Sequence, residues 1–205
     1  IPAGLEGAIT QALAEGQTNY PPSDGIPELR KEVARFYERA LGLVYPIDSI
    51  LIAGGARPVI YATYKAVLDP GEKVLYPVPS WNNNHYAFLS GAKAVELVVG
   101  PETGFLPTAE AIAPLLEDVR LICINTPLNP TGTVMPAAQV REIASLVVDE
   151  NRRRLAAGKR PVFIMWDHVY WMLTFGEARH HTPPGLVPES AAWISSSSSW
   201  PPMRA

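Results

Sequence analysis

The sequence has little cysteine, little charge and no long apolar run. Its 205 residues include one cysteine, Cys123, which excludes an internal disulfide framework and makes a reducing, cytoplasmic setting the expectation. No apolar run approaches the ~20 residues that a membrane-spanning helix needs, so we expect no membrane partner. With 17 basic and 20 acidic side chains, the chain also lacks the basic excess typical of proteins that bind nucleic acid.

The first residues lack the features of a natural start. Ile1 stands where an initiator Met would be, and neither a basic cluster nor the apolar core of a signal peptide follows it. We therefore expect the sequence to begin inside a longer chain.

What the sequence does have is enough apolar material for a sizeable core. Hydrophobic residues make up 47% and charged residues 18%, which argues against disorder. Five short apolar runs, bounded by Gly, Pro or Asp, are typical of buried parallel strands; they are 50–53, 73–76, 94–98, 121–125 and 162–166. Amphipathic stretches after Pro58 and Pro136 separate them. The alternation predicts an α/β fold with a doubly wound, mostly parallel sheet.

The two ends of the chain differ from this pattern. Residues 5–15 and 26–41 have helical patterns with no strand between them, so we expect residues 1–45 to form a helical arm and residues 46–205 the sheet domain. Five consecutive serines, 195–199, predict a flexible, solvated segment with little packing value.

Candidate binding residues follow the predicted strands, because ligands of open α/β sheets bind at the carboxyl ends of the strands. Gly54 and Gly55 precede a helix whose start could bind phosphate, although a plain tight strand-to-helix turn would also explain them. Trp81 could stack on a planar ligand or could be a core residue. Asn129 could project its amide from a Pro-rich loop or belong to a rigid turn that satisfies its own backbone.

Asp167 ends the last of these runs. A carboxylate in such a poorly solvated place needs a cationic partner, such as a protonated pyridine nitrogen, although a helix cap or a structural ion pair would also account for it. His168 is interpreted as a packing residue. We expect no metal site at His180 and His181, because adjacent histidines in a Pro-rich loop lack the spacing that puts two ligands on one helix face.

Taken in order, these motifs resemble those of the class I/II aminotransferases. These are fold type I enzymes that use pyridoxal 5′-phosphate (PLP), and the aspartate aminotransferase-like branch is the most similar. The resemblance runs from about Leu5 to about His181, and its motifs lie at 20–30, 55–57, 69–74, 77–81, 129–132 and 167–170. Asn-Pro-Thr-Gly followed at family-like separation by Asp-x-x-Tyr is its most specific part.

The resemblance implies a role for each matching residue. Asp167 would pair with the protonated ring nitrogen of PLP, while Asn129 and Tyr170 would bond to its phenolic oxygen. Trp81 would stack on the ring. The phosphate would be held by Gly55, Ala56 and Arg57, and by Tyr20 of the neighbouring subunit, because family members are homodimers that build each site from two chains. Arg204 would also bind the cofactor.

One required residue is missing. The family has a Schiff-base lysine eight residues before an arginine in a Gly-x-Arg pattern; Pro202-Met203-Arg204 resembles that pattern, and the expected lysine position is Ser196. A serine cannot form an imine, so the chain as written is expected at most to bind PLP without a covalent bond. Three explanations stay open: an error or gap in this part of the sequence, a large-domain fragment with an altered tail, and a natural or engineered homologue without the lysine.

The resulting prediction is the incomplete large domain of a PLP-dependent aminotransferase, without the C-terminal small domain. The complete enzyme would move an amino group between an amino acid and a 2-oxo acid. Two alternatives remain: another fold type I activity, such as a carbon–sulfur lyase or a racemase-like reaction, and a non-catalytic, aminotransferase-like effector-binding domain. A dinucleotide-binding protein is disfavoured, because no Gly-x-Gly-x-x-Gly follows the first predicted strand.

Overall fold

The computed structural model describes residues 2–197, which form two compact units, 2–54 and 55–197. The N-terminal unit contains helices α1 (Leu5–Ala14) and α2 (Pro27–Leu41) and the short 3₁₀ helix η1 (Ile47–Ser49). Both helices predicted for this region are present, within one residue of the expected ends. No helix among the described residues is long and apolar enough to span a membrane.

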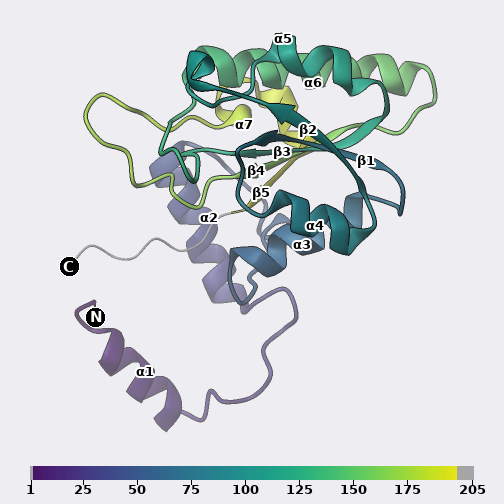
Figure 1. Ribbon diagram of the computed structural model, residues 1–205. Coiled ribbons are helices and arrows are strands. Elements are labelled where there is room, and N and C mark those ends of the chain that lie inside the picture. Colours follow the sequence, from purple (N-terminus) through teal and green to yellow (C-terminus); the bar gives the residue numbers. More distant parts are fainter. Residues whose placement is uncertain (1, 198–205) are drawn as a thin grey trace. The chain divides into compact units, whose positions relative to one another are not determined.

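The second unit is built around a five-stranded sheet in the order β2-β1-β3-β4-β5, with every neighbouring pair parallel (Figure 1). The strands are β1 (Lys73–Val78), β2 (Lys93–Val98), β3 (Val119–Asn125), β4 (Phe163–Asp167) and β5 (Ile194–Ser197). The predicted α/β class with a doubly wound parallel sheet is confirmed.

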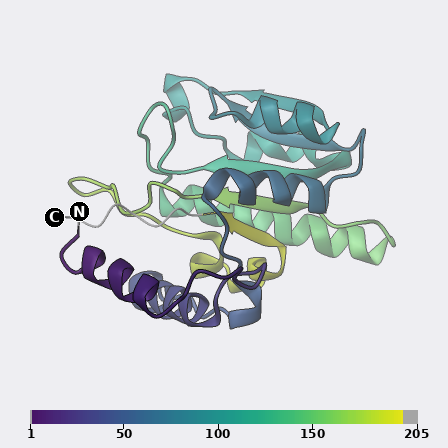
Figure 2. The same ribbon diagram turned by 90° about the horizontal axis from the view of Figure 1, so that it is seen from below.

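Helices cover both faces of this sheet. On one face lie α3 (Ala56–Val67) and α4 (Asn83–Ser90), and on the other α5 (Ala109–Ile112) and α6 (Ala137–Ala156) (Figure 1). Viewed from below, α3, drawn in blue, runs along the strands (Figure 2). Shorter turns complete the unit; they are η2 (Pro101–Thr103), η3 (Ala113–Asp118), α7 (Pro183–Leu186) and η4 (Pro188–Trp193).

Each helix layer has its own core, because successive strand residues point to opposite faces. Ile122 and Ile124 of β3 pack with Val140, Ile143 and Val147 of α6. Leu121 and Cys123 of the same strand belong to the other cluster, which contains Ile60 and Tyr64 of α3. The apolar faces predicted for both helices are therefore the buried ones, and the central strand β3 is buried along its whole length.

One predicted strand was wrong, and one strand was not predicted. Residues 50–53 are irregular, and the backbone N–H of Ile52 bonds to the carbonyl of Asp24, in the turn before α2, at 2.9 Å rather than in a strand ladder. The serine segment instead supplies β5: its backbone pairs with β4, and the Ser195 hydroxyl lies 3.2 Å from that of Thr63 on α3. The backbone hydrogen bonds to β4 stabilise this strand even though serine side chains pack poorly. Ser198 and Ser199 lie outside the described residues.

The N-terminal unit is held together around a buried arginine. Arg30 of α2 is 8% exposed, forms an ion pair with Asp24, and donates to the Ile47 carbonyl at 2.7 Å. These bonds fix the turn before α2 against the segment that follows η1. At their junction Gly25 has φ +100°, and a Cβ added there would lie 2.6 Å from the Cβ of Ile52.

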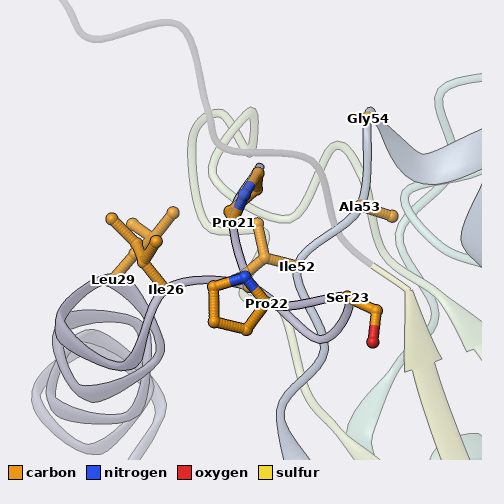
Figure 3. Close-up of a pocket in the computed structure, with 9 residues that line it drawn as sticks. Pro21, Pro22, Ser23, Ile26, Leu29, Ile52, Ala53 and Gly54 are labelled. Carbon is orange, nitrogen blue, oxygen red and sulfur yellow. The ribbon is translucent and has the colours of Figure 1, made fainter. Parts of the chain in front are cut away.

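The same junction borders a hollow of about 550 Å³ (Figure 3). Its lining is mostly apolar, with the Ser23 hydroxyl as a polar group, and comprises Pro21, Pro22, Ser23, Gly25, Ile26, Leu29, Ile52, Ala53 and Gly54. It belongs to the N-terminal unit alone.

Replacing Gly25 by alanine is expected to destabilise the N-terminal unit more than the same change at Gly42. Both glycines have a positive φ, which costs an alanine about 1 kcal/mol. Only at position 25 would the new methyl group also overlap with Ile52, adding about 1–3 kcal/mol. Hydrogen exchange of the α2 amides in both variants measures the difference. Equal losses of protection would contradict the close packing described for Gly25.

Candidate functional site

Three polar side chains meet at the carboxyl ends of neighbouring strands. Asn125, Asp167 and Ser197 end β3, β4 and β5, and the register pairs Asn125 with Asp167 and Asp167 with Ser197. The Ser197 hydroxyl donates to Oδ1 of Asp167, and Nδ2 of Asn125 donates to Oδ2, both at 3.2 Å. The acid predicted to end a strand is therefore held from both neighbouring strands.

Asp167 is buried, and the part of the chain that the structure describes gives it no counter-charge. Its residue is 7% exposed, and burial raises the pKa of its carboxyl to about 6, against the lowering effect of bonds from the Val169 backbone and Ser197. Among residues 2–197 no basic side chain forms an ion pair with it. Neutral donors offset only part of the desolvation cost of a carboxylate, so the site is suited to a cationic group.

Two further predicted residues converge beside this acid. Nδ2 of Asn129 donates to the hydroxyl oxygen of Tyr170 at 3.2 Å, so both polar tips can reach one ligand oxygen. Asn129 lies on the loop after β3 and Tyr170 on the loop after β4. The Asn129 loop also bonds to itself, since the Leu128 N–H donates to the Thr133 carbonyl at 2.8 Å. The loop is therefore a turn that bonds to itself, and it also projects the Asn129 amide toward Tyr170.

The start of α3 lies at the same rim of the sheet. Only residues 68–72 join the end of α3 to the start of β1, so the helix runs against the strands and begins near their carboxyl ends. Gly55 precedes the helix without a side-chain cap, which leaves the N–H groups of the first turn, including those of Ala56 and Arg57, free of that bond. Such a helix start favours a bound anion.

Arg57 and Trp81 lie together near this helix start. The Arg57 guanidinium is 5.7 Å from the centre of the Trp81 ring, and Trp81 is 43% exposed rather than buried in the core. Tyr86 connects them with the acid: burial raises the pKa of its phenol, the Arg57 charge lowers it, and the Asp167 charge raises it further. One hydroxyl therefore lies within electrostatic range of both charged groups.

Ser196, Tyr20 and Arg204 are the other residues that the sequence predicted for the site. Ser196 pairs with Trp166 inside β5, and strand alternation points its side chain to the face opposite those of Ser195 and Ser197. Tyr20 belongs to the N-terminal unit and is fully exposed. Arg204 lies outside the described residues.

The histidines next to the acid form a packed group. His168 is 1% exposed, its Nδ1 is 3.2 Å from Nε2 of His180, and its ring stacks on Trp171. Burial, together with the charge of a neighbouring histidine, lowers the pKa of His168 to about 3 and that of His180 to about 4. The packing interpretation of His168 is confirmed. Within residues 2–197, no group of three or more His, Cys, Asp or Glu side chains is placed to hold a metal ion.

Two residues of this site escaped the sequence analysis. Asn125 was assigned only to the end of an apolar run, and Ser197 to the flexible serine segment. The available signal was their position: in a parallel sheet, polar residues at the last positions of adjacent strands lie side by side.

The fold and the site together define the class of protein. It is a doubly wound α/β protein with a cluster of polar residues at the carboxyl ends of its strands. The model of the family "Aminotransferase class I and II" matches residues 2–197, and the chain belongs to this family.

The chain is similar to individual members of that family. It is 29% identical over 197 residues to the aspartate aminotransferase of Pyrococcus horikoshii, covering 95% of this chain and 48% of that protein. It is 32% identical over 191 residues to a probable aspartate/prephenate aminotransferase of Aquifex aeolicus, covering 92% of this chain and 46% of that protein. The structure of the Thermus thermophilus aspartate aminotransferase with maleate superimposes with a TM-score of 0.85 at 28% identity, covering 96% of this chain and 48% of that chain. The chain thus spans about half the length of these relatives.

Asp167→Asn is expected to stabilise the fold at neutral pH. In the unfolded chain this carboxyl has its ordinary pKa of 3.8, and in the folded protein about 6. The folded protein binds this proton more tightly than the unfolded chain does, and that difference stabilises the fold. This contribution is fully present below pH 3.8 and is lost as the pH rises through 6. Asparagine resembles the protonated acid and does not ionise, so the advantage of the variant should widen by about 2 kcal/mol between about pH 4.5 and about pH 7.5. Urea unfolding at both pH values measures it; a pH-independent difference would show that Asp167 is not destabilised as a carboxylate.

Proposed function

We propose that this chain is the cofactor-binding part of a PLP-dependent aminotransferase. The observation that carries the proposal is Asp167, a buried carboxylate with no ion-pair partner among residues 2–197, at the same rim as an uncapped helix start with an arginine. PLP has a ring nitrogen that can be protonated at one end and a phosphate at the other, so the charges of the rim complement those of the cofactor.

Each residue would contribute a distinct interaction. When bound, PLP supplies an electron-withdrawing pyridinium ring that weakens the bonds at the α-carbon of an amino acid. Asp167 would hold the proton on the ring nitrogen, and the tips of Asn129 and Tyr170 would bond to the phenolic oxygen. Trp81 would lie against the ring.

The phosphate would be bound at the start of α3. The backbone N–H groups there and the Arg57 guanidinium provide donors and positive charge. Tyr20 of a partner subunit in a homodimer is a further proposed phosphate ligand, and Arg204 a further proposed cofactor ligand, both carried over from the family pattern.

For the whole protein we propose an amino acid donor and a 2-oxo acid acceptor. The names of the relatives support aminotransfer. Residues 1–45 are proposed as the helical arm and 46–205 as part of the large domain, although the compact units divide after residue 54.

The sequence has serine, not lysine, at position 196, where the family pattern places the Schiff-base lysine. The five lysines lie on helices, at strand starts or in loops, and none occupies position 196; they are Lys31, Lys65, Lys73, Lys93 and Lys159. Lys73, for example, is 3.0 Å from Asp118 at the amino end of the sheet. We therefore propose that this chain binds PLP without a covalent bond and transaminates poorly.

PLP added to the purified chain should quench tryptophan fluorescence, because Trp81 is proposed to contact the ring. Asp167→Asn should weaken binding about 10- to 100-fold, the effect of losing one charge-assisted bond. Asp118→Asn, which changes an exposed acid at the opposite end of the sheet, is the matched control and should bind like the parent chain. Binding that is equally tight in all three proteins would contradict the role of Asp167.

Borohydride reduction of the same mixture tests the missing lysine. We expect peptide mapping to find no pyridoxyl adduct on a specific lysine. A single, stoichiometric adduct would show that the chain does contain a competent amine.

A further inference from the structure

Beyond these carried-over roles, we propose that Asn125 is a positioning residue that fixes the acid and the amide of the cofactor site relative to each other. The inference rests on the proposed function. It concerns a residue for which neither the sequence motifs nor the family pattern quoted above gave a role.

The geometry of the Asn125 side chain carries the proposal. Nδ2 donates to both the backbone carbonyl of Asp167 at 2.9 Å and its Oδ2 at 3.2 Å, while Oδ1 accepts the backbone N–H of Asn129 at 2.8 Å. Every polar atom of the amide is thus used, and each bond determines which way the amide faces. One side chain connects the residue facing the ring nitrogen with the residue facing the phenolic oxygen.

Burial makes this connection rigid. Asn125 and Asp167 are each 7% exposed, and they end adjacent strands in register. The Thr126 N–H also donates to the Asp167 carbonyl, at 3.0 Å, so the backbone on both sides of the amide is held. Removing the amide would leave the Asn129 N–H and one oxygen of Asp167 without these partners in a site that water reaches poorly.

The charge environment of Asp167 gives the proposal a second readout. Asn125 and the Ser197 hydroxyl bond to the Asp167 carboxyl. Its charge also acts on two titratable groups, Cys123 on β3 and Tyr86 on α4, and burial raises the pKa of both. The Arg57 charge acts on the same Tyr86 phenol and lowers its pKa. A donor to Oδ2 favours the ionised carboxyl, so its loss should raise the pKa of Asp167.

The chain contains a matched control for this amide. Asn151 on α6 is fully buried, and its amide also makes two bonds, to the Val162 carbonyl at 2.8 Å and from the Val162 N–H at 2.7 Å. These bonds lie just before β4, at the strand end opposite Asp167. Asn151→Leu removes a comparable buried amide without touching the proposed site.

The experiment compares the parent chain with Asn125→Leu, Asn125→Asp and Asn151→Leu. Fluorescence titration with PLP should give about tenfold or weaker binding for both Asn125 variants, and binding within about twofold of the parent for Asn151→Leu. Carbon-13 NMR titration of the Asp167 carboxyl in the free proteins should show a raised pKa in both Asn125 variants, more so with the like charge of Asn125→Asp, and no change in Asn151→Leu.

The two readouts separate the two proposals. If the parent chain does not bind PLP, the proposed function fails, while the NMR titration still decides the role of Asn125. If Asn125→Leu and Asn151→Leu give the same PLP affinity and the same Asp167 titration, the positioning role is overturned. Should Asn125→Leu fail to fold, Asn125→Asp, which keeps an acceptor for the Asn129 N–H, serves for both measurements.

Discussion

A carboxylate at the end of β4 has lost most of its water and, from residues 2–197, has gained only neutral donors in exchange. The donors come from Asn125 on one side and Ser197 on the other, because the register of three parallel strands ends them at one level. Helices on both faces of the sheet make this position dry. Asp167 therefore stays costly to ionise, with its pKa raised to about 6, until a positive group comes to lie against it. The parallel sheet, the two helix layers and the serine strand together create this condition.

Around that acid the charges are separated along the rim. The uncapped start of α3 and the Arg57 guanidinium provide positive potential, Asp167 provides the negative group, and the Asn129 and Tyr170 tips lie beside the acid. A rigid ligand with a cationic ring and an anionic tail complements this arrangement better than a ligand of one charge sign. The aminotransferase family, to which the chain belongs, gives the arrangement its chemical interpretation.

The serine strand is where this chain departs from the family pattern that the motifs suggest. Its residues form the fifth strand of the described sheet, and alternate hydroxyls contact Thr63 and Asp167. Alternation turns Ser196, the position counted as the lysine equivalent, toward the face opposite these contacts. Ser195 and Ser197 thus each have a side-chain contact within the sheet unit.

Much of the fold was determined by local pattern. The period of apolar residues located α3 and α6, the Val, Ile and Leu runs located β1 to β4 to within a few residues, and the order of motifs indicated the family. Residues 50–53 show the limit: an apolar run becomes a strand only where a neighbour offers a backbone ladder. The serines of β5 show the converse, since β4 supplied the ladder that their composition did not predict. The meeting of Asn125, Asp167 and Ser197 was likewise decided by tertiary structure, because strand register joins residues that lie 30 or more positions apart. Sequence alone placed polar residues at strand ends; only packing determined which of them touch and how dry that contact is.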